Sequence, residues 1–294
     1  MKHAILGAGG VGGLIGARLA QTGDHVTLLL RPETAARHPG QLWLESPLGD
    51  VKVPVRLDTK LSERVDVLWI AVKAQGLVAA LHAVPSDHLG IAAIVPLLNG
   101  IDHVAVLRSR FEREHVVPGT IAVESERVEA GHIIQRSPFA RLALSAAAQP
   151  QLEGVAARLR DTGLSCEFQA DEKTMLWGKL AFLAPFALVT TASDKGIQEI
   201  LADRLGREQL ESAIREVCAV AKAEGATVDL ARVLATIESL PATMRSSMQK
   251  DVTAGRVPEL DAIGGPIVRV GRSHGIDVTT TCQLIARIEG RLHR

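Results

Sequence analysis

Residues 2–21 read KHAILGAGGVGGLIGARLAQ, a short apolar run followed by a glycine-rich turn and by apolar residues at helical spacing. Glycines at 7, 9 and 12 match the pattern GxGxxG. In this pattern the first glycine permits a tight turn, the second lets the backbone approach a pyrophosphate, and the third lets helix and strand pack closely. The next helix would direct its free N–H groups at the phosphates. We therefore expect a dinucleotide to contact the whole turn, namely Gly7, Ala8, Gly9, Gly10, Val11 and Gly12. The alternative, a glycine-rich turn in an unrelated α/β protein, fits this strand–turn–helix order less well.

Three more apolar runs follow in the first half of the chain, at His25–Leu30, Val67–Val72 and Ile91–Leu97. They alternate with helical patterns, which is typical of parallel βαβ units covered on both faces. Residues 42–57 and 132–145 also have a strand-like pattern, and there we expect antiparallel additions to the sheet. The first half thus predicts an open, mostly parallel sheet.

From about residue 171 the apolar residues recur three or four apart, as in Leu210, Ile214 and Val217. No later segment has a convincing strand pattern. We therefore predict an α/β protein with an N-terminal Rossmann dinucleotide-binding domain at residues 1–169 and an all-helical domain at residues 170–294.

Composition excludes several classes of protein. The 294 residues are 47% apolar and 22% charged, with 33 basic and 33 acidic side chains. A net charge of zero with no basic cluster argues against nucleic acid as a partner. The three cysteines, Cys166, Cys218 and Cys282, form no CxxC pair, so we expect neither a disulfide framework nor a metal site. No signal peptide or uninterrupted apolar span appears, so we expect a cytoplasmic protein without a membrane partner. An apolar surface on the helical half could form a homodimer.

Polar residues follow three of the predicted strands, where ligands of open α/β sheets bind. Arg31 comes after the second run, at the position where NAD-binding proteins usually carry an acid for the ribose hydroxyl. A cation there suits a 2′-phosphate, so we expect NADPH. Two alternatives remain: Arg31 is a surface arginine, or Glu33 binds the ribose as in NAD enzymes. Lys73 and Asn99 close the next two runs and offer a cation and an amide, or simply end the strands.

The chain resembles the ketopantoate reductase (2-dehydropantoate 2-reductase) family in both halves. The matching pieces in the first half are Gly7–Gly12, Arg31, Val72-Lys73-Ala74, Asn99-Gly100 and Gly119-Thr120. Those in the second half are Trp177-Gly178-Lys179-Leu180, the block from Ser246 to Val252, and the block from Arg256 to Asp261. The resemblance implies NADPH-dependent reduction of ketopantoate to D-pantoate, on the route to pantothenate and coenzyme A, in a cleft between the two domains.

The same resemblance implies roles for four residues. Lys179 corresponds to the proton donor, Glu259 to the carboxylate that completes the site, and Asn99 and Ser247 to substrate contacts. An ammonium can stabilise the negative charge that develops on a ketone oxygen and then protonate it. The apolar neighbours of Lys179 would lower its pKa toward the working pH. Taken alone, Lys179 could extend to solvent, Glu259 could favour a helix N-terminus, and Ser247 could be a capping hydroxyl.

The likeness departs from the family on the helix that carries Lys179. Where the family usually has asparagines four and eight residues after the lysine, this chain has Leu183 and Ala187. A third family asparagine corresponds to Lys195, which could pair with a carboxylate. A buried polar substrate group without a partner costs roughly 1–3 kcal/mol. The missing asparagines thus affect the choice of substrate more than the reaction type. We expect a small 2-oxo acid as the substrate, with ketopantoate as the first candidate and a different 2-oxo acid as the alternative. A silent NADPH-binding protein is a third reading, against which the retained Lys179 argues.

Overall fold

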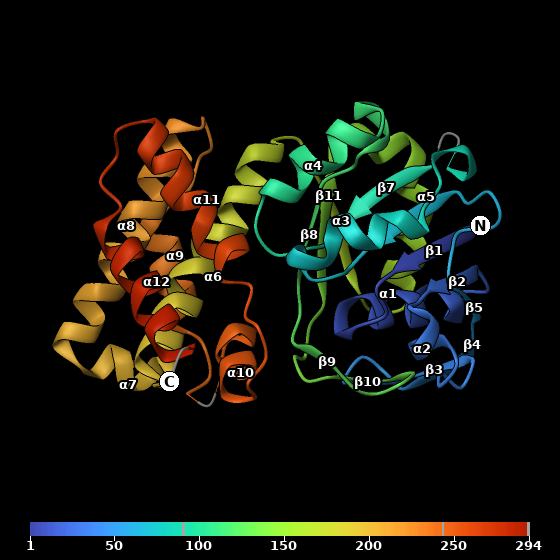
Figure 1. Cartoon of the computed structure of the whole chain (residues 1–294), viewed down its shortest axis with the longest axis horizontal. Helices are drawn as coiled ribbons and strands as arrows, with labels where there is room; N and C mark the ends of the chain where they lie inside the picture. Colours follow the sequence, from blue (N-terminus) through green and yellow to red (C-terminus); the bar gives the residue numbers. More distant parts are fainter. Residues whose placement is uncertain (90–91, 243, 293–294) are drawn as a thin grey trace. The chain divides into compact units, whose positions relative to one another are not determined.

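The computed structural model describes residues 1–89, 92–242 and 244–292, which divide into two compact units (Figure 1). Ile91, the start of one predicted strand, lies outside these ranges. Unit 1 comprises Met1–Leu98 and His103–Glu172, and unit 2 comprises Asn99–Asp102 and Lys173–Arg294. The units change three residues after the predicted boundary, and the short segment Asn99–Asp102 joins the second unit.

A parallel sheet of five strands forms the centre of unit 1, in the order β5-β2-β1-β6-β7. Its strands are β1 (Lys2–Leu6), β2 (His25–Leu29), β5 (Arg56–Asp58), β6 (Val67–Ile70) and β7 (Ala93–Pro96). The chain moves from β1 to β2 on one side and returns to β6 on the other. Strand order therefore reverses beside β1, directly before the glycine turn, where ligands of such sheets bind.

Two smaller sheets complete unit 1, so the prediction of antiparallel additions to the parallel sheet is wrong. One is β4-β3-β10-β9, made of β3 (Gln41–Glu45), β4 (Val51–Pro54), β9 (Ser125–Glu129) and β10 (His132–Gln135). The other is β12-β11-β8, made of β8 (Gly119–Ala122), β11 (Arg141–Ser145) and β12 (Ser165–Gln169). The four-stranded sheet packs its buried Leu42 and Ile133 onto helix α1 (Gly10–Gln21), because Gly13 and Gly16 leave room for them. Its apolar residues thus cover α1 instead of extending the parallel sheet.

The remaining helices of unit 1 lie in the loops between strands. They are α2 (Pro32–Ala35), α3 (Leu77–Ala80), α4 (Asp102–Arg110, whose first residue belongs to unit 2) and α5 (Gln149–Asp161).

All regular secondary structure among the described residues of unit 2 is helical, which together with the parallel sheet of unit 1 confirms the predicted fold class. Its helices are α6 (Glu172–Ser193, whose first residue belongs to unit 1), α7 (Ile197–Ala202), α8 (Arg204–Ala223), α9 (Leu230–Glu238), α10 (Ser247–Thr253), α11 (Leu260–Ser273) and α12 (Thr279–Leu292). Helix α6 is long and apolar enough to cross a membrane by length and composition, but 78% of its apolar window is buried inside the protein. Most of its residues are buried in the apolar core of unit 2, and it continues through Pro185.

A buried histidine lies in the first strand of unit 1. The indole Nε1 of Trp69 donates to His3 Nδ1 at 3.3 Å, so His3 carries its proton on Nε2 and donates it to Asp24 Oδ2 at 3.2 Å. Burial lowers the pKa of His3 from 6.5 to about 4, although Asp24 opposes that shift. His3 is therefore neutral in the folded protein at pH 7.

We expect His3 to make the protein acid-sensitive between pH 6.5 and 4. In that window the unfolded chain binds a proton that the folded protein refuses, so the free energy of unfolding falls by up to roughly 1.4 kcal/mol per pH unit as pH decreases. Urea unfolding at pH 7, 5.5 and 4.5 measures this slope. The variant His3→Gln keeps a neutral polar side chain and should lose less stability over the same range. Equal slopes for the two proteins would contradict the assignment.

Candidate functional site

The glycine turn of unit 1 has the shape that the sequence predicts. Gly7 adopts a φ of +97°, and a Cβ on it would come within 2.7 Å of the Val72 side chain. A Cβ on Gly12 would overlap the carbonyl oxygen of Gly7, so the close approach of helix and strand requires glycine there. A Cβ on Gly9 would meet no atom within 4 Å. Gly9 thus borders open space at the start of α1.

Helix α1 begins at this turn with its N–H groups unoccupied by side chains. Its N-cap, Gly9, supplies no capping hydrogen bond, and the first turn holds no acidic residue. The first N–H groups of a helix have no partner within the helix and carry its positive dipole end. The turn therefore fits a pyrophosphate group.

One residue of this region was not predicted from the sequence. The Ser125 hydroxyl, at the start of β9, donates to the carbonyl oxygen of Gly10 at 3.0 Å. A Cβ on Gly10 would overlap the Ser125 carbonyl. Ser125 therefore holds the turn in place through this hydrogen bond, and nothing in its local sequence distinguishes it from other serines.

Two predicted cations follow the strands that flank β1. Arg31 follows β2 and is exposed, and its guanidinium has no hydrogen bond or ion pair within the described residues. Lys73 follows β6, is also exposed, and precedes the 3-10 turn η1 (Ala74–Gly76). Since β1, β2 and β6 are parallel neighbours, both cations lie at the sheet edge that carries the glycine turn. This edge can hold an anionic cofactor.

Lys179 lies on α6 in unit 2, seven residues after the first residue of that helix. Burial lowers the pKa of its ammonium from 10.5 to about 8, and the negative charge of Glu259 opposes that shift. The residue as a whole is partly exposed, and its ammonium makes no hydrogen bond or ion pair within the part of the chain described. The apolar residues before and after Lys179 on α6 desolvate the ammonium and so lower its pKa. An accessible ammonium that loses its proton near neutral pH can act as an acid.

Glu259 and Asn99 lie together in unit 2. The amide Nδ2 of Asn99 donates to Glu259 Oε2 at 3.0 Å. Glu259 is the N-cap residue of α11, yet its carboxylate makes no capping hydrogen bond. Its side chain is therefore turned to Asn99, and its place at the N-terminus of α11 also agrees with the alternative of a glutamate that favours a helix N-terminus.

Packing explains why Asn99 belongs to the helical unit although the sequence places it after a strand. Gly100 has a φ of +81°, and a Cβ on it would overlap the carbonyl of Ala262 on α11. Asp102 forms an ion pair with Arg269, also on α11. The segment Asn99–Asp102 thus contacts α11 and its N-cap residue through three of its four residues.

Ser247 is the first residue of α10 and is exposed. The capping role that it could have had belongs to Ser246, whose hydroxyl accepts from the Gln249 N–H at 3.1 Å. Within the described ranges no hydrogen bond joins Ser247 to Lys179, Asn99 or Glu259. Of the four residues predicted in unit 2, the structure thus brings Lys179, Asn99 and Glu259 together. Glu259 accepts from Asn99 and acts through its charge on Lys179.

The helix face beyond Lys179 is apolar. Leu183 is partly exposed one turn later, and Ala187 is fully buried after another turn. Lys195 follows the end of α6, and Ser193 is already roughly 21 Å from Lys179 along the axis at 1.5 Å per residue. Lys195 therefore does not pair with the carboxylate of a small substrate held at Lys179.

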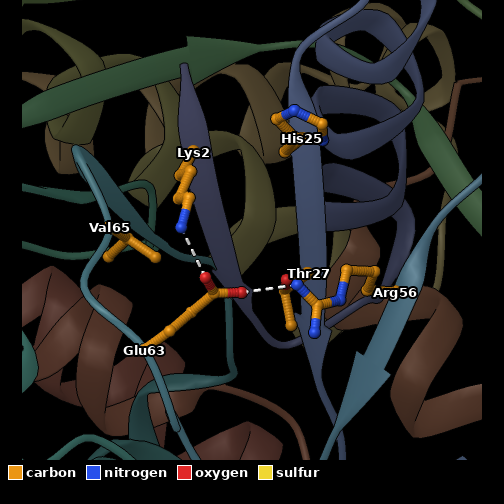
Figure 2. Close-up of a pocket in the computed structure, with 6 residues that line it drawn as sticks. All are labelled: Lys2, His25, Thr27, Arg56, Glu63 and Val65. Atoms are coloured by element: carbon orange, nitrogen blue, oxygen red, sulfur yellow. Dashed lines mark hydrogen bonds and ion pairs between the residues drawn. The ribbon is translucent and has the colours of Figure 1, made fainter.

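A separate cavity of about 120 Å³ lies at the opposite edge of the parallel sheet (Figure 2). Figure 2 shows Lys2 and Arg56 both directed at Glu63, with N–O distances of 2.6 Å in each pair. Lys2, His25 and Arg56 are the first residues of their strands. Because ligands of such sheets bind at the carboxyl ends of the strands and both cations are paired, this cavity is not the cofactor site.

Known proteins match nearly the whole chain. The family model described as "Ketopantoate reductase PanE/ApbA" matches residues 3–149, and the model of its C-terminal part matches residues 171–291. A 2-dehydropantoate 2-reductase of Caulobacter vibrioides is 30% identical over 294 residues, with 96% of each chain covered. An uncharacterized oxidoreductase of Bacillus subtilis, YkpB, is 30% identical over 283 residues, with 91% of each chain covered.

Solved structures share the fold. A PanE/ApbA family ketopantoate reductase from Ralstonia eutropha has a TM-score of 0.89 at 26% identity and covers 100% of this chain and 99% of its own. A D-mandelate dehydrogenase bound to NADH and anilino(oxo)acetate has the same TM-score at 22% identity, with the same coverage of both chains.

Proposed function

The chain belongs to the ketopantoate reductase family of oxidoreductases, and from that premise we propose that it uses NADPH to reduce 2-dehydropantoate to D-pantoate. The product leads to pantothenate and coenzyme A, and we place the reaction in the cytoplasm. One observation supports the proposal above the others. Lys179 has an accessible ammonium without a hydrogen-bond partner within the described residues, a pKa of about 8, and Glu259 as its opposing charge.

The residues of unit 1 fit the proposed cofactor. The backbone of Gly7–Gly12 would hold the pyrophosphate, Arg31 the 2′-phosphate, and Lys73 would add a second cation. When bound, NADPH supplies a hydride to the carbonyl carbon of the substrate. The open space beside Gly9 allows the phosphates to approach the N-terminus of α1.

The residues of unit 2 would complete the reduction. Negative charge develops on the carbonyl oxygen as the carbon is reduced, and the Lys179 ammonium stabilises that charge before donating a proton from Nζ. The negative charge of Glu259 favours the protonated form of Lys179, so more of the lysine carries the proton that it donates. Asn99 fixes the orientation of the Glu259 carboxylate through its amide. This assignment makes Lys179 the acid and Asn99 and Glu259 its supports.

A second candidate substrate is a 2-oxo acid with an apolar side chain. Leu183 and Ala187 give the face of α6 beyond Lys179 only carbon atoms. The hydroxymethyl group of ketopantoate has no partner on that face, whereas an alkyl or aryl group would pack against it.

NADPH oxidation with a panel of 2-oxo acids distinguishes the candidates. The panel contains ketopantoate, 2-oxoisovalerate, phenylglyoxylate and pyruvate, each at matched concentration. Ketopantoate should have the highest kcat/KM. If 2-oxoisovalerate or phenylglyoxylate has a higher kcat/KM than ketopantoate, the proposed substrate becomes a 2-oxo acid with an apolar side chain. Tight NADPH binding without turnover of any member would overturn the reductase assignment.

We expect Arg31 to determine the cofactor preference. Arg31→Ala should reduce kcat/KM for NADPH by about tenfold or more, since a hydrogen bond to a charged group is worth roughly 1.5–3 kcal/mol, and should leave NADH almost unaffected. Steady-state kinetics with both cofactors measure this. Glu33→Ala is the matched variant two residues away and should leave the ratio unchanged. A loss of NADH use in Glu33→Ala, with no change in Arg31→Ala, would contradict the preference for NADPH.

A further inference from the structure

Arg269 on α11 joins two carboxylates at the surface of unit 2. Its Nη1 donates to Asp261 Oδ1 at 2.6 Å, and its Nη2 donates to Asp102 Oδ2. Asp261 lies eight residues earlier on the same helix, whereas Asp102 lies 167 residues earlier in the chain. Asp102 belongs to the segment Asn99–Asp102. The guanidinium thus links α11 to the segment that carries Asn99.

The surface of α11 leaves room for this guanidinium at Gly265. Asp261, Gly265 and Arg269 are spaced four residues apart, so they share one face of the helix. A Cβ on Gly265 would overlap Asp261 Oδ1 and would lie 2.6 Å from Nη1 and 2.8 Å from Nη2 of Arg269. The guanidinium therefore lies against the helix backbone, between the two carboxylates. An isolated surface ion pair contributes little, but a network of charges with fixed geometry contributes more.

The ion pair with Arg269 holds the segment Asn99–Asp102 at its last residue. Asp102 is also the first residue of α4, and the chain returns to unit 1 directly after it. Only two residues separate Asp102 from Asn99, so their Cα atoms are at most about 11 Å apart. A displacement of Asp102 therefore reaches Asn99 through very little intervening chain.

The position of Asn99 matters because of the hydrogen bond that it makes. Its Nδ2 donates to Glu259 Oε2 at 3.0 Å, and the negative charge of Glu259 acts in turn on the Lys179 ammonium. A hydrogen bond weakens steeply when its donor and acceptor move out of line. The orientation of the Glu259 carboxylate thus depends on how firmly the segment is held on α11.

We propose that Arg269 is a positioning residue for the reduction. It holds Asp102 on α11, so the Asn99 amide stays on Glu259 and the carboxylate keeps its orientation. Arg269 acts through Asp102 and Asn99. This inference rests on the proposed function, because its effect is on the rate of that reaction.

Steady-state kinetics at saturating NADPH, with the panel acid that the wild type reduces fastest, test this role. Arg269→Ala should lower kcat about tenfold, since misplacing a group remote from the reacting atoms costs up to about 100-fold. Asp102→Asn should cause a similar loss, and the double variant should be no slower than Arg269→Ala, because both changes break one ion pair. Arg269→Lys keeps the charge but not the forked geometry, and it should lose no more than about threefold. Arg272→Ala removes the same charge from an exposed position on α11 and should keep the wild-type kcat.

An Asn99→Ala background separates positioning from a general effect on the helix. In that background Arg269→Ala should lower kcat by less than about twofold, because the amide that it positions is absent. An equal loss in both backgrounds, or a wild-type kcat in Arg269→Ala, would overturn the role of Arg269. If Arg269→Ala does not fold, Asp102→Asn provides the same comparison in both backgrounds. A wild-type protein that reduces no acid of the panel would instead overturn the proposed function, and this role with it.

Discussion

Replacing Lys179 with methionine is expected to lower kcat for 2-oxo acid reduction by at least about 100-fold, because general-acid catalysis and oxyanion stabilisation are lost together. Methionine keeps the length and apolar contacts of the lysine stem. The ammonium makes no hydrogen bond within the described residues, so its removal breaks none there and takes away only the charge that faces Glu259. The loss of kcat in this variant therefore reports how much the charge and the proton of Lys179 contribute to the rate. Single-turnover NADPH oxidation with saturating substrate provides the rate.

The pH dependence gives an independent measure of the same group. The catalytic form of Lys179 is the protonated one, and its pKa in the folded protein is about 8. The wild-type rate should therefore be constant below that pH and fall about tenfold per pH unit above it. Lys179→Met should lose this decline. A wild-type rate that stays constant to pH 10 would contradict the role of Lys179 as the acid.

Stability measurements separate catalysis from folding in this experiment. The pKa of Lys179 is lower in the folded protein than in the unfolded chain, so the unfolded chain binds more protons between pH 8 and 10.5. Below pH 8 the charged lysine therefore disfavours folding, and Lys179→Met should melt at an equal or higher temperature at pH 7. Lys222→Met, at an exposed position on α8, is the matched control and should keep full activity. Near-normal turnover in Lys179→Met would contradict the proposed mechanism.

The parallel sheet and the glycine turn could be predicted because their signals are local. A buried parallel strand is a continuous apolar run, and the turn requires glycine at fixed offsets within six residues. Gly7 and Gly12 show the reason directly, since one has a positive φ and the other leaves no space for a Cβ. Arg31 and Lys73 could be placed at the same edge because strand ends of a parallel sheet coincide.

The group around Lys179 depends on contacts between distant segments, which the sequence does not encode locally. Asn99 and Glu259 are 160 residues apart, and their hydrogen bond exists because Gly100 lets the chain pass against Ala262. The resemblance to a family named these residues but did not explain their arrangement. Ser125 had no signal at all, because its role depends on β9 lying behind the turn at Gly10. The strands of the four-stranded sheet were assigned to the wrong sheet for a similar reason. A strand pattern predicts that a residue is buried, but it does not indicate which helix or sheet buries it.

Replacing Gly9 with alanine is expected to weaken NADPH binding by up to about 100-fold, since overpacking a tight contact costs roughly 1–3 kcal/mol. The methyl group would occupy the open space where we place the pyrophosphate, and it would meet no protein atom within 4 Å. Gly9 has a φ of −81° and a ψ of −159°, which alanine adopts without strain. The folded protein should therefore tolerate the change, apart from up to about 1 kcal/mol for a poorer N-cap residue. Fluorescence titration of NADPH measures the affinity.

The effect of Gly9→Ala on NADPH must be distinguished from the effect of a methyl group on the fold. Gly290 on α12 provides the matched change, because a Cβ there also meets no atom within 4 Å. Gly290→Ala should leave NADPH binding unchanged and slightly raise stability, as alanine favours a helix more than glycine does. If Gly9→Ala binds NADPH as tightly as Gly290→Ala does, the space beside Gly9 does not hold the phosphates, and the cofactor must approach α1 from another side. If it loses NADPH while its melting temperature matches that of the wild type, the loss comes from the methyl group in the binding space, because no other property of the turn has changed.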